Sequence, residues 1–305
     1  MAGNEDKGFK HAIILGAGAI GSYYGALLST KVDVLLIGRR DHVDAINDGG
    51  LVVSGSPGGR FRIRASTELR DAHQDSLMLL TTKAHDSEAV IKGVRRILKP
   101  DTTILVLQNG LGNEALVSAL VGPGVEVVRG LASSGVEFLV PGRIEVKFSG
   151  ETVLPKTQAC ERMKRLFDSC GLETRLADRM DAEIWRKLTL NCVINPLTAL
   201  FRVPNKEIAH DSLREIRHRI VDECMRVAKE EGVVLESSLH EEVNTATTSY
   251  SNKSSMCQDI IKGRKTEIDF LNGRVSELGK KHGVPTPIND VLTALIKFME
   301  GKEWT

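Results

Sequence analysis

A glycine-rich turn near the start of the chain, set between a strand pattern and a helix pattern, constrains the fold most strongly. Residues 11–15 form a short apolar run, which is typical of a strand buried on both faces. The motif Gly16-Ala17-Gly18-Ala19-Ile20-Gly21 follows and opens a helical pattern. In this context the first glycine allows a tight turn, the second lets backbone approach a pyrophosphate, and the third lets helix and strand pack closely. The sequence therefore predicts a dinucleotide-binding unit.

The residues after the next predicted strand indicate which dinucleotide binds. The apolar run 32–37 ends at Gly38-Arg39-Arg40. An NAD-binding fold usually carries an acidic residue here for the ribose 2′-hydroxyl, whereas an arginine accommodates a 2′-phosphate. The two arginines favour NADPH as cofactor. Asp41 is a contrary signal, and surface arginines without a ligand are the alternative interpretation.

Further strand patterns at residues 77–80, 103–107 and 125–128 alternate with helical segments. This alternation predicts an α/β fold with a doubly wound, Rossmann-type parallel sheet. Residues 51–53 and 61–64 flank a Gly- and Ser-rich stretch and predict a hairpin-like excursion from that sheet.

Polar turns follow two of these strands, and ligands of such sheets collect at the carboxyl ends of strands. Lys83, in the turn after residues 77–80, is a candidate for contact with a cofactor phosphate. Asn109, after residues 103–107, is a candidate for a hydrogen bond to nicotinamide ribose or substrate. Without other context, however, Asn-Gly at the end of a strand is most often an ordinary turn.

From about Asp181 onwards the apolar spacing is helical, so we predict an NADP-binding domain over residues 1–179 and an all-helical substrate domain over residues 180–305. Lys187, Asn191 and Asn195 are spaced four apart, which places them on one polar stripe of an otherwise apolar helix. Such a stripe needs a polar partner, because each unsatisfied buried amide costs about 1–3 kcal/mol. A surface stripe, or a buried lysine paired with a local carboxylate, is the alternative. Pro196 is expected to end or kink this helix.

Composition limits the classes of partner. The 41 Lys plus Arg balance 40 Asp plus Glu, so no field that would collect nucleic acid or acidic lipid is expected. The five widely spaced cysteines fit reduced thiols in the cytoplasm, and no cluster has metal-ligand spacing. The polar N-terminus lacks signal-peptide character, and the glycine-interrupted run 12–28 is a poor membrane span. We expect a cytoplasmic protein that acts on a small molecule.

Five motifs taken together carry a resemblance to a known family. They are Gly16 to Gly21, Gln108-Asn109-Gly110, Trp185-Arg186-Lys187 with Asn191 and Asn195, Ser254 to Asp259, and Thr266-Glu267-Ile268-Asp269. In this order, over nearly the whole chain, they resemble the 2-dehydropantoate 2-reductase (ketopantoate reductase) family. The glycine motif is shared by many dehydrogenases, whereas the helix with Lys187, Asn191 and Asn195, followed by Ser254-Ser255-Met256 and Thr266-Glu267-Ile268-Asp269, is specific.

The resemblance implies NADPH-dependent reduction of the C2 ketone of 2-dehydropantoate to pantoate, on the route to pantothenate and coenzyme A. It implies that Lys187 is the general acid and that Glu267 reaches both the cofactor and the active site. Substrate-binding residues implied by the resemblance are Asn109, Asn191, Asn195, Asn205, Asn252 and Ser255. Cofactor-binding residues implied by it are the motif Gly16, Ala17, Gly18, Ala19, Ile20 and Gly21, with Arg39, Lys83, Asn109, Val136 and Glu267. Around Val136 the sequence Ser133-Ser134-Gly135 departs from the family, which more often shows Thr and Ala.

Two other functions fit the sequence. The first is a related dehydrogenase acting on a different 2-oxo or 3-hydroxy acid, because pocket lining decides which side chain is accepted. The second is a non-catalytic NADPH-binding sensor, which would have no use for the stripe of Lys187, Asn191 and Asn195. A helical second domain is also compatible with a homodimer.

Overall fold

The computed structural model describes residues 8–249 and 252–302 of the 305-residue chain. These residues form two compact units, which we describe separately. The first contains residues 8–108 and 112–178, and the second contains Asn109–Leu111 with the described residues from Arg179 onwards.

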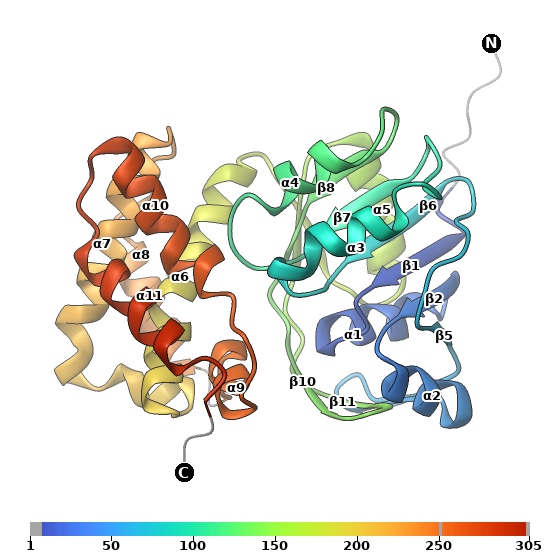
Figure 1. Ribbon diagram of the computed structural model, residues 1–305, viewed down its shortest axis with the longest axis horizontal. Helices are drawn as coiled ribbons and strands as arrows, with labels where there is room; N and C mark the ends of the chain where they lie inside the picture. Colours follow the sequence, from blue (N-terminus) through green and yellow to red (C-terminus); the bar gives the residue numbers. More distant parts are fainter. Residues whose placement is uncertain (1–7, 250–251, 303–305) are drawn as a thin grey trace. The chain divides into compact units, whose positions relative to one another are not determined.

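The first unit is built on a six-stranded parallel sheet (Figure 1). Its order is β5 (Arg64–Ser66), β2 (Asp33–Ile37), β1 (His11–Leu15), β6 (Ser76–Leu80), β7 (Thr103–Val106) and β8 (Glu126–Arg129). Counted along the chain this is strand order 3-2-1-4-5-6, the arrangement of doubly wound dinucleotide-binding folds. The predicted Rossmann-type sheet is therefore confirmed.

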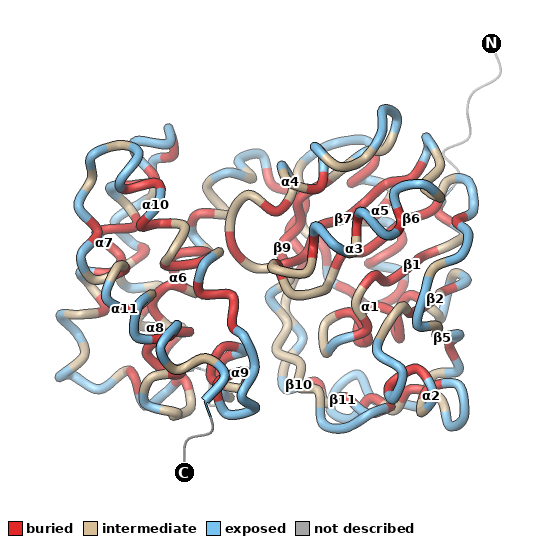
Figure 2. The backbone as a smooth tube through the Cα atoms, viewed as in Figure 1, coloured by how far each residue is buried: buried red, intermediate tan, exposed pale blue. Residues whose placement is uncertain are grey.

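Alternation along the central strands divides their side chains between two cores. Ile14 of β1 and Leu79 of β6 share a core with α1 (Ala19–Leu28) and α5 (Gln158–Ser169). Ile13 and Met78, one position earlier, share the other core with α3 (Ser87–Val94) and α4 (Asn113–Leu120). Figure 2 accordingly shows the central strands as buried. Burial on both faces explains why these strands are apolar without interruption.

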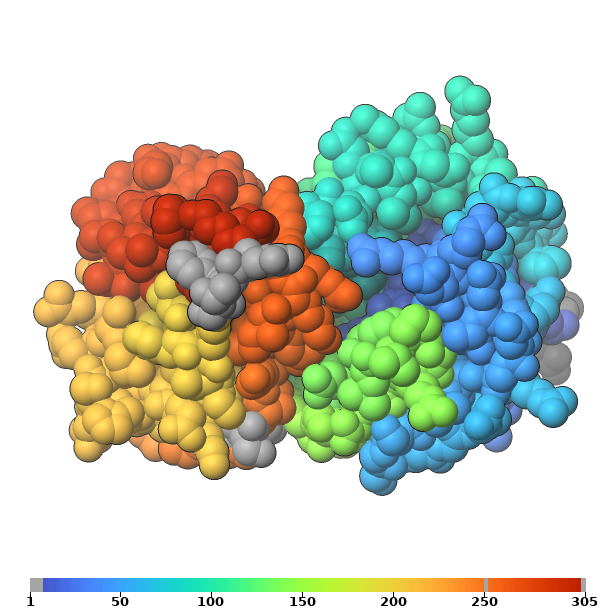
Figure 3. Space-filling model, turned by 60° about the horizontal axis from the view of Figure 1, so that its bottom comes forward, coloured from blue at the N-terminus to red at the C-terminus, as the bar shows by residue number. Residues whose placement is uncertain are grey.

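The excursion after β2 and α2 (Arg40–Gly49) joins a second sheet, of order β10-β11-β3-β4. The strands β3 (Leu51–Gly55) and β4 (Gly59–Phe61) are antiparallel, as the predicted hairpin requires. The prediction extended the second strand to Arg64, which instead begins β5 at the edge of the main sheet. Figure 3 shows the hairpin of β10 (Gly135–Val140) and β11 (Arg143–Phe148), in green, against the blue segment that contains β3.

A small third sheet completes the first unit and was not predicted. It contains β13 (Thr174–Ala177), β12 (Thr152–Pro155) and β9 (Leu131–Ala132). Its central strand is tied to α1 by a buried hydrogen bond of 2.6 Å between the hydroxyl groups of Tyr24 and Thr152.

Helices build the second unit, and no strand occurs among its described residues. They are α6 (Met180–Phe201), α7 (Arg214–Glu230), α8 (Leu239–Ser249), α9 (Ser255–Ile261), α10 (Asn272–His282) and α11 (Pro287–Met299). Short 3₁₀ turns lie between them at η2 (Asn205–Ala209), η3 (Asp211–Leu213) and η4 (Ile268–Phe270). One apolar core joins all six helices and includes Leu188 of α6, Val227 of α7 and Ile296 of α11.

The sequence predicted that Pro196 ends or kinks the helix that carries Lys187. This helix, α6, is the longest of the unit and does not end at Pro196. It continues for five more residues and ends at Phe201, followed by Arg202 in the left-handed region at φ 56°. A proline inside a helix leaves the carbonyl four residues earlier without its donor, here that of Cys192. The side-chain amide of Asn272 donates to this carbonyl at 2.9 Å, which replaces the lost bond and lets the helix continue.

In the described residues no helix is both long enough and apolar enough to cross a bilayer. All five cysteines are buried free thiols.

We predict that Tyr24→Phe lowers the free energy of unfolding by about 1–2 kcal/mol, because it leaves the buried Thr152 hydroxyl without its partner. Tyr23→Phe is the matched control. The Tyr23 hydroxyl donates to Ser149 over a longer 3.2 Å in a partly buried position, so a smaller loss is expected. Urea unfolding of both variants measures the difference, and equal losses would contradict the prediction.

Candidate active site

The glycine-rich turn between β1 and α1 has the geometry that close packing demands. Gly16 has φ +110°, and a Cβ atom there would lie 2.5 Å from the backbone nitrogen of Thr82. A Cβ atom on Gly21 would lie 2.1 Å from the carbonyl oxygen of Gly16. The backbone N–H groups of Gly16 and Ala17 both donate to the carbonyl of Ile37, at 3.0 and 2.8 Å. Gly16 and Gly21 are therefore required by the packing itself, with or without a ligand.

Gly18 differs from the other two glycines, because a Cβ atom there would meet nothing within 4 Å. The residue is exposed and occupies the N-cap position of α1, where it offers no side chain to cap the helix. The first turn, with Ala19 and Ile20, carries no acidic side chain. Open space at an uncapped helix N-terminus without a nearby carboxylate suits an anionic group. The turn therefore fits a dinucleotide pyrophosphate, although contact with a cofactor stays a prediction.

Arg39 and Arg40 follow β2 and are both exposed. Arg39 is the N-cap residue of α2 and Arg40 is its first residue. A Cβ atom on Gly38 would lie 2.8 Å from the Cβ of Ala17, which places this corner directly against the glycine-rich turn. The position of both guanidinium-bearing residues at the carboxyl end of β2 agrees with the edge at which a ribose phosphate binds in such folds.

A buried histidine, His42, links this corner to its surroundings and was not identified from the sequence. Its Nδ1 accepts from the backbone N–H of Gly142 at 2.8 Å, so its Nε2 carries the proton in the neutral ring and faces the Ser22 hydroxyl at 3.0 Å. The Ser22 hydroxyl in turn donates to the carbonyl of Ala17 at 3.3 Å. Burial lowers the pKa of His42, which favours this neutral form.

Gln108 at the end of β7 organises the neighbouring turn. Its side-chain amide donates to the carbonyls of Thr82 and Lys83, at 2.8 and 3.2 Å, and lies 2.8 Å from the Ser87 hydroxyl. Lys83 precedes η1 (Ala84–Asp86) in extended conformation and is partly buried. Gln108 thus fixes the backbone from which Lys83 projects. The sequence motif contained Gln108, but only the structure shows this role.

Asn109 belongs to the second unit together with Gly110 and Leu111. Its side-chain amide donates to a carboxylate oxygen of Glu267 at 3.3 Å, so two predicted site residues meet. Glu267 is only 6% exposed, contrary to the ordinary expectation of a solvated acid. Gly110 has φ +89°, and a Cβ atom on it would lie 2.3 Å from the carbonyl oxygen of Phe270. The Asn-Gly pair is therefore more than a generic turn, because it is packed against the segment that holds Glu267.

The predicted stripe of Lys187, Asn191 and Asn195 lies on α6. Lys187 and Asn191 are partly buried, and Asn195 is 6% exposed. These values exclude a fully solvated stripe. The adjacent Arg186 is exposed and pairs with Glu242.

The remaining substrate candidates lie on two segments joined by a backbone hydrogen bond. The N–H of Asn205 donates to the carbonyl of Asn252 at 2.9 Å. Asn205 is 6% exposed, and its side-chain oxygen has no hydrogen-bond partner among the described residues. An unsatisfied buried acceptor is costly, so a hydrogen-bond donor from a ligand or a water would be favourable here.

Ser255 is the exposed first residue of α9, whereas the N-cap of that helix is the buried Ser254. Ser254 accepts from the N–H of Cys257 at 3.1 Å and lies 2.7 Å from the hydroxyl of Thr198 on α6. Ser254 therefore ties α9 to α6 and leaves the Ser255 side chain outside the apolar core.

Val136, a predicted cofactor contact, lies in strand β10 opposite Val146. The backbone of β10 shifts register between Gly135 and Val136. Such an irregularity leaves backbone groups outside the regular ladder. A cofactor contact by Val136 stays a prediction.

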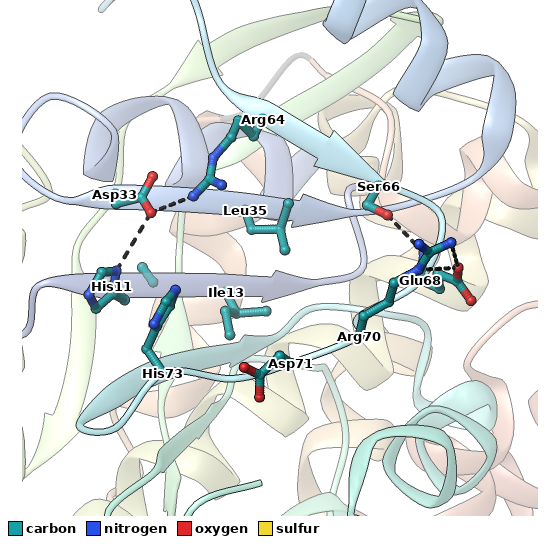
Figure 4. A pocket seen from close by; sticks show the side chains of 11 residues that line it. His11, Ile13, Asp33, Leu35, Arg64, Ser66, Glu68, Arg70, Asp71 and His73 are labelled. Atoms are coloured by element: carbon teal, nitrogen blue, oxygen red, sulfur yellow. Dashed lines mark hydrogen bonds and ion pairs between the residues drawn. The ribbon is translucent and has the colours of Figure 1, made fainter. Parts of the chain in front are cut away.

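A groove on the first unit contains none of the predicted site residues (Figure 4). It runs along β1, β2 and β5, from His11 and Asp33 at the amino ends of β1 and β2 to Ser66 at the end of β5. Its charged groups are already matched in the ion pairs Asp33–Arg64 and Glu68–Arg70. No cluster of three potential metal ligands occurs among the described residues. Because these charges are paired and no predicted site residue lines the groove, the groove gives no support for a second candidate site.

Chemically, the described site residues combine a cation with several neutral amides and one buried carboxylate. A lysine can donate a proton or stabilise negative charge on an oxygen, and amides can orient hydroxyl and carboxylate oxygens. These groups suit the reduction of a carbonyl.

Two family models together match most of the chain. "Ketopantoate reductase PanE/ApbA" matches residues 12–159, and "Ketopantoate reductase PanE/ApbA C terminal" matches residues 179–300.

Individual relatives match over almost their whole length. A 2-dehydropantoate 2-reductase of Pyrococcus horikoshii is 36% identical over 94% of this chain and 96% of that protein. The crystal structure of a PanE/ApbA family ketopantoate reductase from Ralstonia eutropha has a TM-score of 0.89 at 29% identity, covering 95% and 98% of the two chains. A D-mandelate dehydrogenase solved with NADH and anilino(oxo)acetate has a TM-score of 0.88 at 29% identity, with the same coverage.

We predict a pH-dependent stability that depends on His42. Because its pKa is lower in the folded protein than the ordinary value of about 6.5, the unfolded chain binds the proton more readily. Stability is therefore greatest above the unfolded pKa and falls as the pH drops through it towards the folded pKa. For one proton the slope is at most about 1.4 kcal/mol per pH unit.

Urea unfolding between about pH 7 and about pH 5 measures this slope. We expect His42→Asn to have a shallower slope than wild type, because it removes the titrating ring. The exposed His73→Asn is the control and should keep the wild-type slope. A wild-type slope in His42→Asn would contradict the assignment.

Proposed function

The chain belongs to the ketopantoate reductase family, and we propose that it reduces the C2 ketone of 2-dehydropantoate to give pantoate, with NADPH as hydride donor. The curated relatives bear the name of this oxidoreductase. The observation that carries the proposal within the molecule is the set of partly or fully buried polar residues in the second unit. Lys187, Asn191 and Asn195 share one helix, and Asn109 meets Glu267.

Lys187 acts as the general acid in this proposal. Reduction of a ketone places negative charge on its oxygen, so a nearby ammonium group lowers the barrier by electrostatic attraction and then by proton donation. Partial burial on α6 supports this role, because charges interact more strongly where water is excluded.

The neutral side chains orient the substrate. Asn191 and Asn195 project from α6, and Asn205 offers a buried side-chain oxygen that can accept from a substrate hydroxyl. Asn252 and Ser255 lie beside Asn205 and at the start of α9. Amides and hydroxyls can hold both the carboxylate and the hydroxyl of the substrate without adding charge. Glu267 orients Asn109 through their hydrogen bond.

The first unit is proposed to hold the cofactor. The exposed Gly18 and the acid-free start of α1 fit the pyrophosphate, and Lys83 and Val136 are further contacts. Arg39 is proposed to bind the 2′-phosphate and so to favour NADPH over NADH. When bound, the nicotinamide supplies the hydride.

A different 2-oxo acid is the second candidate substrate. The D-mandelate dehydrogenase that resembles this chain was solved with an aromatic 2-oxo acid derivative and NADH. Relatives of one fold thus differ in the side chain that they accept, and the proposed catalytic residues suit either substrate. A homodimer acting in the cytoplasm is also compatible with the sequence.

We predict that Lys187→Ala lowers kcat by about a hundredfold or more, with little change in NADPH affinity, because the general acid is lost while the cofactor contacts remain. The measurement is NADPH oxidation with 2-dehydropantoate, together with a fluorescence titration of NADPH. Arg186→Ala, on the same helix but exposed and paired with Glu242, is the control and should keep kcat. Near-normal turnover by Lys187→Ala would remove this residue from the mechanism.

Wild-type protein should oxidise NADPH faster with 2-dehydropantoate than with 2-oxoisovalerate or phenyl(oxo)acetate. Faster turnover of phenyl(oxo)acetate would favour the second candidate substrate.

We predict that Arg39→Ala raises KM for NADPH about tenfold or more, because one charge-assisted contact is lost, and leaves KM for NADH unchanged. Arg70→Ala, in the groove of Figure 4, is the control. An equal rise in KM for both cofactors would exclude Arg39 from 2′-phosphate binding.

A further inference from the structure

The core of the second unit contains a chain of buried polar groups that the proposed chemistry does not use. Glu223 of α7 is 2% exposed, and Asn272 and Asn289 are fully buried. The carboxylate of Glu223 accepts from the N–H groups of Ile288 and Asn289 at 2.9 and 3.0 Å, and from the side-chain amide of Asn289 at 2.7 Å. It thereby satisfies the first turn of α11 from another helix.

The chain continues from α11 through α10 to α6. The side-chain oxygen of Asn289 accepts from the amide of Asn272 at 2.9 Å. The same amide nitrogen donates its other hydrogen to the carbonyl of Cys192 at 2.9 Å. Both donors of the Asn272 amide are therefore used, and its oxygen has no partner among the described residues. Asn272 therefore acts as a hydrogen-bond donor to the Cys192 carbonyl of α6.

The carbonyl that receives this bond is the one that Pro196 leaves without an N–H donor. It belongs to the residue directly after Asn191 and lies one turn before Asn195. Proline within a helix opens the preceding turn, so the direction of both asparagine side chains depends on what holds that carbonyl. A second contact lies on the other side of Pro196, where the Thr198 hydroxyl donates to the carbonyl of Ile194 at 2.7 Å and lies 2.7 Å from the Ser254 hydroxyl.

Stability alone is a poor reason for this arrangement. Alanine at position 196 would restore the helical bond, and apolar residues could then fill the positions of the buried amides and carboxylate. Replacement of buried polar networks by apolar groups is often neutral or stabilising. The arrangement is explained if the replacement of a helical hydrogen bond at Pro196 by the Asn272 side chain has a function.

We propose that Asn272, held by Asn289 and Glu223, is a positioning residue that sets the direction of Asn191 and Asn195 by fixing the turn opened by Pro196. The inference rests on the proposed function, in which these two asparagines bind the 2-oxo acid. It assigns Asn272 no contact with substrate or cofactor.

The test compares Pro196→Ala, Asn272→Leu and the double variant with wild type. In Pro196→Ala the new N–H donates to the Cys192 carbonyl and closes the turn, so we expect an unchanged or higher Tm but a KM for the 2-oxo acid raised about tenfold. In Asn272→Leu the carbonyl loses its donor, and we expect a lower Tm and a similarly raised KM. The double variant should recover Tm but not KM. Affinity for NADPH should stay at the wild-type value throughout.

A merely structural network predicts a different result, because the double variant would then recover Tm and KM together. That recovery, or a wild-type KM in Pro196→Ala, would overturn the proposal. Pro196→Ala decides the question even if Asn272→Leu does not fold. Ser276→Ala, a buried change on the same helix as Asn272, is the matched control and should leave KM unchanged.

The proposed function can fail separately. If wild-type protein reduces no 2-oxo acid, the function is wrong, and crystal structures of wild type and Pro196→Ala then decide the positioning claim. Reorientation of the Asn191 and Asn195 side chains relative to Lys187 would support it, and unchanged directions would overturn it.

Discussion

Helix α6 has to carry a lysine and two asparagines through an apolar core, and the polar interactions of the second unit follow from that constraint. The carbonyl freed by Pro196 is satisfied by Asn272, and the carbonyl of Ile194 is satisfied by Thr198. Asn272 thereby ties α10 to α6, and the Thr198 hydroxyl, 2.7 Å from that of Ser254, ties α9 to α6. The helix therefore remains continuous while its polar residues keep a defined direction.

The first unit also combines polar candidate residues with an apolar core, but it places them in turns after strands rather than on a long helix. Its strands are apolar because both faces are covered, so polar groups can gather only where the strands end. There the turns are held by side chains that have no predicted ligand contact, namely Gln108 beside Lys83 and His42 beside Ala17. In both units the candidate ligand-binding residues stand on backbone fixed by buried amides, hydroxyls or an imidazole.

Local patterns were sufficient for the main sheet and for the stripe on α6, because alternation and helical spacing are properties of adjacent residues. They failed where the decisive partner is distant. The sequence left open whether the helix ends at Pro196, since nothing near it reveals that Asn272, 80 residues from Cys192, supplies the missing donor. The pairing of β10 with β11 and of β11 with β3 likewise depends on contacts that a single stretch does not encode. The burial of Glu267 and the roles of His42 and Ser254 were hidden for the same reason.

The three residues Asn109–Leu111 have a consequence for how this chain can be divided. They are held by Glu267 and by the carbonyl of Phe270, yet the residues on both sides of them belong to the first unit. The backbone therefore passes from one unit to the other three times. No single cut yields two complete pieces, because a fragment starting at Arg179 would lack a segment that packs against η4. During synthesis the ribosome must reach Phe270, in the last quarter of the chain, before Asn109–Leu111, made in its first half, can pack against their partners.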